Sequence, residues 1–303
     1  MTLNLLRRAA VLVLPALCLL VLACSSSTAG DPLVPTPSAG PAVAGSTSSP
    51  AGSPTPTLAP GQFEILALDA LSASAASLAR DLGPRIGIAV VVPSQRRIYQ
   101  YNAEPQFPIA SVIKVPIMLT VMHQAIEDGR VISDQETDLI DAMITESDND
   151  AATELWNHVG GERGVMDYLE TVDISGVTLV NENWGESEMS AVSAARLMNK
   201  LVQGETLDEP HREYALELLA HVDPVQDWGA VVAGNFDGIA GVKNGWYPEY
   251  EGWVLGSLGY VIPEGDSPAF TIAIFTDEWD YFGQAVNKIE ILGGIINTAL
   301  SEQ

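Results

Sequence analysis

Cysteine is scarce in this chain, which has only Cys18 and Cys24 among its 303 residues. A disulfide framework is therefore excluded. Basic residues are also few, since 14 Lys and Arg stand against 39 Asp and Glu, for a net charge of −25. A chain this acidic repels phosphate backbones and anionic lipid, which argues against general nucleic-acid binding and against electrostatic docking to membranes. The apolar share of 47% excludes wholesale disorder.

Metal-binding patterns and internal repeats are missing as well. The four histidines have no paired ligand spacing; they are His123, His158, His211 and His221. We therefore predict structural roles for the histidines, and we expect neither a metal nor another cofactor.

The first residues are similar to a bacterial lipoprotein signal. Arg7 and Arg8 precede an apolar stretch, and Ala23 then stands before Cys24. The apolar stretch is too short for a typical membrane-spanning helix. We expect residues 1–23 to be removed and Cys24 to carry lipid, which would place the protein outside the cytoplasm, anchored to the cell membrane by this lipid alone. Ordinary secretion and an uncleaved anchor stay open as alternatives.

A tether is expected after Cys24. Residues 24–61 are dominated by Ser, Thr, Pro, Gly and Ala, and Asp31 is the one charged residue among them. Such a segment buries too little apolar surface to offset the entropy of ordering it. Its prolines predict an extended spacer. The folded part is then residues 62–303.

The folded part is predicted to be an α+β domain. Helices are expected over residues 65–82, 109–127 and 282–300, and strands over 86–92, 97–102, 238–243, 252–261 and 269–275. Residues 131–222 are predicted to be helices and loops throughout. We expect a five-stranded antiparallel sheet flanked by the terminal helices, with a helical subdomain inserted after the second strand.

Three short motifs carry the candidate chemistry. In Ser111-Val112-Ile113-Lys114, the i to i+3 spacing places the hydroxyl and the amine on one helical face. A lysine desolvated among the neighbouring apolar residues would have its neutral form favoured, as a general base requires. Taken alone, the motif is weak evidence for catalysis, because it occurs by chance in many proteins and is better explained by a serine at a helix start and a lysine extended toward solvent.

The second motif is Ser147-Asp148-Asn149, and the third is Lys243-Asn244-Gly245 at the end of an apolar strand. Alone, the second is explained by a helix N-cap and the third by a hairpin turn. Gly245 also lets a substrate backbone approach the strand edge.

Together, in this order, the three motifs resemble those of class A β-lactamases and penicillin-binding proteins. The resemblance covers residues 62–303 and implies a β-lactamase/transpeptidase-like fold. It implies that Ser111 is the acylated nucleophile, Lys114 its proton acceptor, and Ser147 the relay of a proton to the leaving nitrogen. It further implies that Asn149 binds Lys114 and the substrate amide, and that Lys243 keeps the field positive. The backbone N–H groups of Ser111 and Trp246 would form the oxyanion hole, and Asn244 and Gly245 would contact substrate.

Several departures from the family bear on the substrate. The Glu-x-x-Leu-Asn loop, whose glutamate activates the deacylating water in class A enzymes, is missing, and Glu182 or Glu186 is left as a possible substitute. The last arginine is Arg212, although family enzymes place an arginine after the strand motif to bind the substrate carboxylate. The segment between Lys114 and Ser147 is shorter than in typical class A enzymes, which predicts a more open cleft.

Two classes of function therefore stay open. The first is an exported serine hydrolase that forms an acyl-enzyme at Ser111 with β-lactams or peptidoglycan-derived amides, with slow deacylation and D-alanyl peptidase-like chemistry as one form. The second is a tethered binding protein that keeps the fold without useful catalysis. A simple esterase is a third, weaker reading. We expect a monomer.

Overall fold

The computed structural model describes residues 58–59, 61–83, 85–231 and 238–303. The expected signal, Cys24 and all of the expected tether except residues 58, 59 and 61 lie outside this part of the chain. Among the helices in the described ranges, none has both the length and the apolar content needed to cross a membrane.

The main sheet has six strands in the order β1-β3-β2-β9-β8-β7. Their bounds are β1 Glu64–Ala67, β2 Ile86–Val92, β3 Arg97–Tyr101, β7 Gly238–Pro248, β8 Trp253–Pro263 and β9 Phe270–Trp279. All seven residues of β2 are buried, which agrees with its run of Ile and Val and with its place inside the sheet. β7 is an edge strand and pairs with β8 along its whole length.

The α+β class is confirmed, but the prediction of a purely antiparallel five-stranded sheet is wrong by one strand. β1 pairs with β3 in parallel, and the other neighbours are antiparallel. β1 has only four residues, and its apolar residues also fit a helical period. The prediction of one helix over residues 65–82 is for this reason wrong at β1. The observed helix α1 spans Ala73–Asp81, and the Ser72 hydroxyl caps it by accepting from the Ala75 amide at 3.2 Å.

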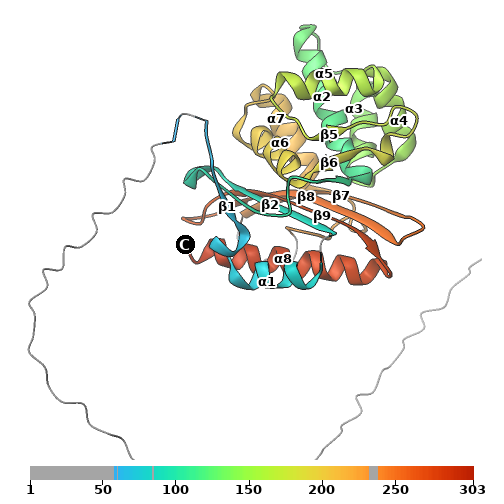
Figure 1. Cartoon of the computed structure of the whole chain (residues 1–303). Helices are drawn as coiled ribbons and strands as arrows, with labels where there is room; N and C mark the ends of the chain where they lie inside the picture. The colour runs from blue at the N-terminus through green and yellow to red at the C-terminus, as the bar shows by residue number, and fades with distance from the viewer. Residues whose placement is uncertain (1–57, 60, 84, 232–237) are drawn as a thin grey trace, which may run out of the picture. The chain divides into compact units, whose positions relative to one another are not determined.

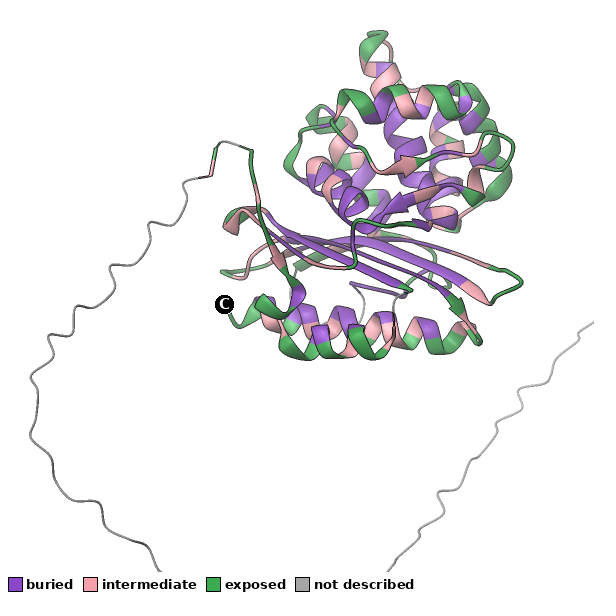
Figure 2. Ribbon diagram, in the orientation of Figure 1, coloured by how far each residue is buried: buried purple, intermediate pink, exposed green. Residues whose placement is uncertain are grey.

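Helices cover both faces of the sheet (Figure 1). The terminal helices α1 and α8 (Phe282–Ser301) lie on one face, and a helical region lies on the other. That region contains α2 Lys114–Glu127, α3 Asp134–Asp141, α4 Asn149–His158, α5 Gly161–Thr171, α6 Ala191–Gln203 and α7 Glu209–Ala220. Buried residues line both interfaces with the sheet (Figure 2). The two-sided covering explains why the central strands read as continuous apolar runs.

The helical region also contains strands that the sequence interpretation missed. β4 (Gln106–Pro108), β5 (Val177–Thr178) and β6 (Glu188–Ser190) form a small three-stranded sheet in the order β4-β6-β5. The prediction of helices and loops alone for residues 131–222 is therefore wrong at β5 and β6. Strands of two and three residues have no readable period, and their pairing with β4 bridges segments far apart in sequence. This sheet places the loop between β5 and β6 beside the site described next.

Candidate active site

Ser111 and Lys114 lie where the short helix η3 (Ala110–Ile113) runs into α2. The preceding residue, Ala110, has a left-handed backbone with φ of 47°, an uncommon conformation for a residue with a side chain. Ser111 is partly exposed, whereas Lys114 is completely buried. Among the described residues, none forms a hydrogen bond with the Ser111 hydroxyl. The three-residue spacing thus leaves the hydroxyl at the surface and places the amine inside.

The Ser147-Asp148-Asn149 segment joins a π-helical turn, η4 (Ala142–Glu146), to α4. Ser147 has a left-handed backbone with φ of 57°. Asp148 is the N-cap of α4, and its carboxylate accepts from the Ala151 amide at 2.7 Å. Asn149 is the first residue of that helix. The N-cap explanation therefore holds for Asp148, while the backbone turn directs Ser147 and Asn149 toward Lys114.

The buried amine of Lys114 connects the first two motifs. Its Nζ donates to the Ser147 carbonyl at 2.6 Å, to Asn149 Oδ1 at 2.7 Å and to Ser147 Oγ at 3.1 Å. Lys243 of β7 reaches the same hydroxyl from the other side, with Nζ at 2.9 Å from Ser147 Oγ. Lys243 is also buried, at 1% exposure, and donates to the Asn244 carbonyl at 3.1 Å. One hydroxyl is thus held between two lysines.

Burial acts on the protonation of both lysines. It lowers the pKa of Lys114 from 10.5 to about 8, although the nearby Asp148 charge raises it. This is the direction expected from the apolar residues around Lys114. Burial also lowers the pKa of Lys243 far below its ordinary value, and the Lys114 charge lowers it further. Two ammonium groups on one hydroxyl repel each other, so the network favours a state with one of the amines neutral.

Gly245 brings strand β7 against η3. A side chain at this position would put a Cβ 2.5 Å from the Ser111 amide nitrogen, 2.6 Å from the Ile109 carbonyl oxygen and 2.8 Å from the Val112 nitrogen. Only glycine allows this approach of the two backbones. Ser111 and Trp246, whose N–H groups are the predicted oxyanion hole, both line the same cleft.

Asn244 lies on the opposite face of β7 from its two motif partners, as strand alternation requires. Its buried amide donates to the backbone carbonyls of Gln226 at 2.9 Å and Trp228 at 2.6 Å. Asn244 is not among the cleft-lining residues. Its side chain therefore fixes the segment before β7 instead of facing the cleft.

The cleft has a volume of about 560 Å³. Ser111 and Asn149 line it, and its charged lining residues are Glu182 and Glu186. Both glutamates are exposed, on the loop between β5 and β6. The loop thus closes one side of the cleft with carboxylates, without burying either of them next to Ser111.

Trp184 of the same loop covers the catalytic lysine candidate. Its ring centroid lies 5.2 Å from Lys114 Nζ, and its indole N–H donates to Thr153 Oγ1 at 3.1 Å. Thr153 in turn donates to the Asn149 carbonyl at 2.8 Å. Stacking an aromatic face over an amine favours its charged form but also excludes water from it.

Thr153, Trp156 and Asn157 also line the cleft, and the sequence interpretation missed them. They lie on α4 at four, seven and eight residues after Asn149, and therefore share its helical face. Once Asn149 is assigned to the site, this helical spacing predicts that the three residues lie beside it. Trp253, on β8, is not part of the lining and packs against Phe282, with ring centroids 5.3 Å apart.

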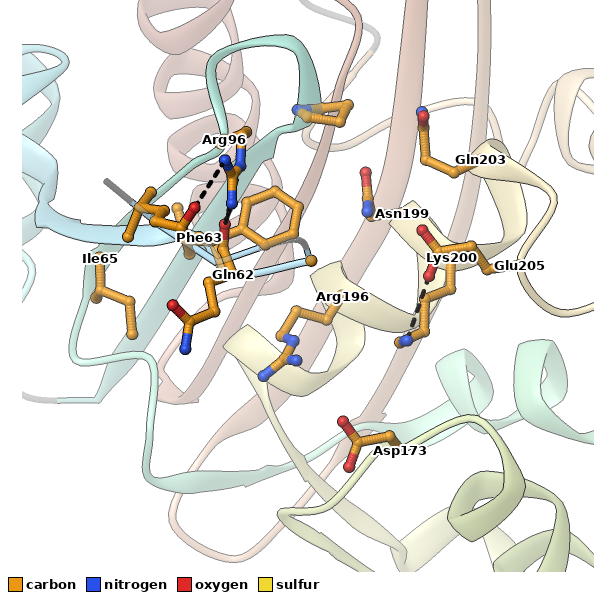
Figure 3. A pocket seen from close by; sticks show the side chains of 14 residues that line it. Gln62, Phe63, Ile65, Arg96, Asp173, Arg196, Asn199, Lys200, Gln203 and Glu205 are labelled. Carbon is orange, nitrogen blue, oxygen red and sulfur yellow. Dashed lines mark hydrogen bonds and ion pairs between the residues drawn. The ribbon is translucent and has the colours of Figure 1, made fainter. Parts of the chain in front are cut away.

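A second hollow, of about 880 Å³, lies between the start of the described chain, the β2–β3 turn and α6 (Figure 3). Arg96 here donates to the backbone carbonyls of Leu58 and Gln62, and Lys200 pairs with Glu205 at 3.3 Å. Within the described residues, no serine or cysteine lines it. The three motifs converge on the first cleft, not on this one.

Comparison with protein families agrees with this convergence. The profile described as the Beta-lactamase enzyme family matches residues 70–138 and 135–300, which together cover more than half of the chain. The chain belongs to the β-lactamase enzyme family. Its fold is that of class A β-lactamases, which agrees with the resemblance read from the motifs.

Individual relatives of this β-lactamase family member are distant. β-Lactamase CARB-3 of Pseudomonas aeruginosa is 24% identical over 166 residues, which cover 44% of this chain and 57% of the relative. The match thus spans less than two thirds of the curated relative. Among solved structures, the TLA-1 extended-spectrum β-lactamase has a TM-score of 0.67 at 15% identity, covering 77% of this chain and 99% of that one. A class A β-lactamase from Bacteroides cellulosilyticus has a TM-score of 0.66 at 18% identity, covering 78% and 99%.

Proposed function

We propose that the protein is an exported serine hydrolase in which Ser111 forms an acyl-enzyme with β-lactams or related cell-wall amides. The observation that supports this most directly is that the Nζ groups of Lys114 and Lys243 both donate to the Ser147 hydroxyl, with Lys114 three residues after Ser111. A nucleophile, a base with a lowered pKa and an orienting network are the elements that covalent acyl transfer requires.

The proposed reaction involves three proton transfers. Neutral Lys114 takes the proton of the Ser111 hydroxyl as its oxygen bonds to the substrate carbonyl carbon. The N–H groups of Ser111 and Trp246 stabilise the oxyanion that forms. The Ser147 hydroxyl then gives its proton to the amide nitrogen, the C–N bond breaks, and a lysine amine returns a proton to Ser147. The amine of a linear amide departs, whereas the amine of an opened β-lactam ring stays attached to the acyl group; in both cases an ester at Ser111 remains.

We infer that this ester is hydrolysed slowly. Glu182 and Glu186 are the candidate bases for the deacylating water, but both are solvent-exposed. The position over Lys114 is taken by the Trp184 ring, which would exclude water from the amine. This arrangement favours a penicillin-binding or D-alanyl peptidase-like protein over a fast β-lactamase.

The mass of the intact domain, followed over time after mixing with a penicillin, tests this proposal. We expect the mass to rise by one penicillin molecule and the adduct to persist for many minutes. The Ser111→Ala variant should gain no mass. A transient adduct with complete hydrolysis of the drug would contradict slow deacylation, and an adduct on Ser111→Ala would contradict the assignment of the nucleophile.

The acylation rate should depend on pH through Lys114. Because burial lowers its pKa to about 8, the neutral form that accepts a proton increases as the pH rises through that value. We therefore expect the second-order rate of adduct formation to rise between pH 6.5 and 9.5, with a midpoint near 8. The check is adduct formation by mass at fixed ionic strength. A rate that falls or stays flat over this range would exclude Lys114 as the base.

A second candidate function is a ligand-binding lipoprotein without useful catalysis. The altered carboxylate pocket favours it, because no arginine follows the strand motif and Tyr247 at the end of the motif strand donates to Glu249 Oε1 at 3.0 Å. Turnover of any ester or amide that depends on Ser111 would eliminate this alternative. For either function, we propose export through residues 1–23, lipidation at Cys24 and a tether to residue 61.

A further inference from the structure

The mouth of the cleft is negatively charged. Glu182 and Glu186 belong to its lining, and Tyr247 at its edge donates to Glu249 Oε1 at 3.0 Å. Burial and the Glu249 bond raise the pKa of Tyr247, and the charges of Glu186 and Glu188 add to this effect. Carboxylates from two segments, the β5–β6 loop and the end of β7, therefore face the same tyrosine.

Positive charge does not balance these carboxylates at the cleft surface. Within the described residues, no lysine or arginine lines the cleft. Lys114 and Lys243 lie beneath it, and burial lowers the pKa of both. After Gly245 the chain has one further basic residue, Lys288, which is in α8 on the far face of the sheet.

Aromatic residues also line the cleft. Trp184 and Tyr247 are partly exposed there, whereas Trp156 is buried and the Trp246 ring packs against Trp228 and Phe282, with ring centroids 5.6 and 5.8 Å apart. Aromatic faces beside carboxylates attract ammonium groups, whereas a carboxylate in the same place meets like charge and the negative faces of the rings.

We propose that the cleft binds acyl substrates that carry a positively charged amine near the Tyr247 end more tightly than substrates with a carboxylate there, so that a penicillin, which carries a carboxylate, acylates Ser111 but binds weakly. The occupant is an ester or amide with an ammonium group on one side of the reacting carbonyl. The statement that these compounds react as substrates rests on the proposed acyl-enzyme at Ser111. The charge preference in binding does not depend on that reaction. It reverses the carboxylate preference that the family resemblance alone would imply.

Binding to the Ser111→Ala variant tests the preference without turnover. Two thioesters with the same phenylacetyl group are compared by calorimetry: one with thiocholine, which carries a quaternary ammonium, and one with thioglycolate, which carries a carboxylate. At about 20 mM salt we expect the thiocholine ester to bind about tenfold more tightly, and the ratio should shrink to about twofold at 0.5 M salt. Equal binding, or tighter binding of the thioglycolate ester, would overturn the proposal.

Matched variants locate the effect. Adding Glu186→Gln and Glu249→Gln to the Ser111→Ala protein should reduce the tenfold ratio to about threefold or less. Glu302→Gln removes one carboxylate, as each of the two cleft substitutions does, at an exposed position at the end of α8, and it should leave the ratio unchanged. If Glu302→Gln reduces the ratio as much as the cleft variants do, general net charge explains the preference and the proposed site is wrong.

Acylation of the unmodified protein separates this inference from the proposed function. Preferred binding of the thiocholine ester to Ser111→Ala, without any adduct on the unmodified protein, would support the charge preference and contradict the acyl-enzyme. An adduct from both thioesters without a binding difference would support the acyl-enzyme and contradict the charge preference.

Discussion

Replacing Lys114 with methionine is expected to slow acylation of Ser111 about 1000-fold, within the range that a positioned general base contributes. Methionine has a similar length and suits a fully buried site, but it cannot accept the serine proton. It also removes the three bonds from Nζ to Ser147 and Asn149. The measurement is the second-order rate of penicilloyl adduct formation by intact mass.

The stability of this variant distinguishes lost chemistry from lost structure. Because burying an amine is costly, its replacement by an apolar side chain should leave Tm unchanged or higher. Lys288→Met, on α8 away from the cleft, is the matched control and should acylate at the normal rate. A Lys114→Met protein that acylates within threefold of normal would refute the role of Lys114.

Substitution of Gly245 by alanine is expected to lower acylation about 100-fold and to lower Tm by about 3–10 °C, the shift that follows from an overpacking cost of roughly 1–3 kcal/mol. The added methyl group would overlap the Ser111 nitrogen and the Ile109 carbonyl, which are backbone atoms and cannot rotate away. Strand β7 must then separate from η3, which pulls the Trp246 N–H away from the Ser111 N–H. Differential scanning calorimetry and adduct formation are measured on the same preparation.

Gly283→Ala provides the control for this substitution. Gly283 lies near the start of α8, and a Cβ there meets no atom within 4 Å. Alanine favours a helix over glycine, so Tm should stay constant or rise slightly and acylation should be normal. Equal behaviour of the two alanine variants would show that the contact between β7 and η3 is not what positions the site.

Much of this architecture was readable from local sequence. The continuous apolar residues of β2, β8 and β9 are enough to predict these strands, because strands of a sheet covered on both faces are apolar on both faces. The three motifs identified the lysines, Ser147 and Asn149, and the structure places these side chains within hydrogen-bonding distance of one another. Their separation along the chain was no obstacle, because the motif order implied a known arrangement.

What the sequence could not reveal depends on contacts between distant segments. β1 and the small sheet of β4, β5 and β6 are too short for a period to develop, and only their partners define them. The Trp184 ring over Lys114 joins a loop and a helix seventy residues apart in sequence, and no local pattern indicates that stacking. Asn244 was assigned to substrate because of its motif, but the alternation of β7 turns it toward the Gln226 and Trp228 carbonyls.

The position of β7 at the edge of the main sheet also bears on self-association. A long edge strand normally exposes a row of unpaired amides and carbonyls, to which a second copy can add and begin an aggregate. Here the central residues 241–245 are buried, and η3 lies against Gly245. The strand ends at Pro248, which has no N–H to offer. The same packing that forms the cleft therefore protects the longest edge of the sheet from strand addition, and it favours solubility at high local concentration.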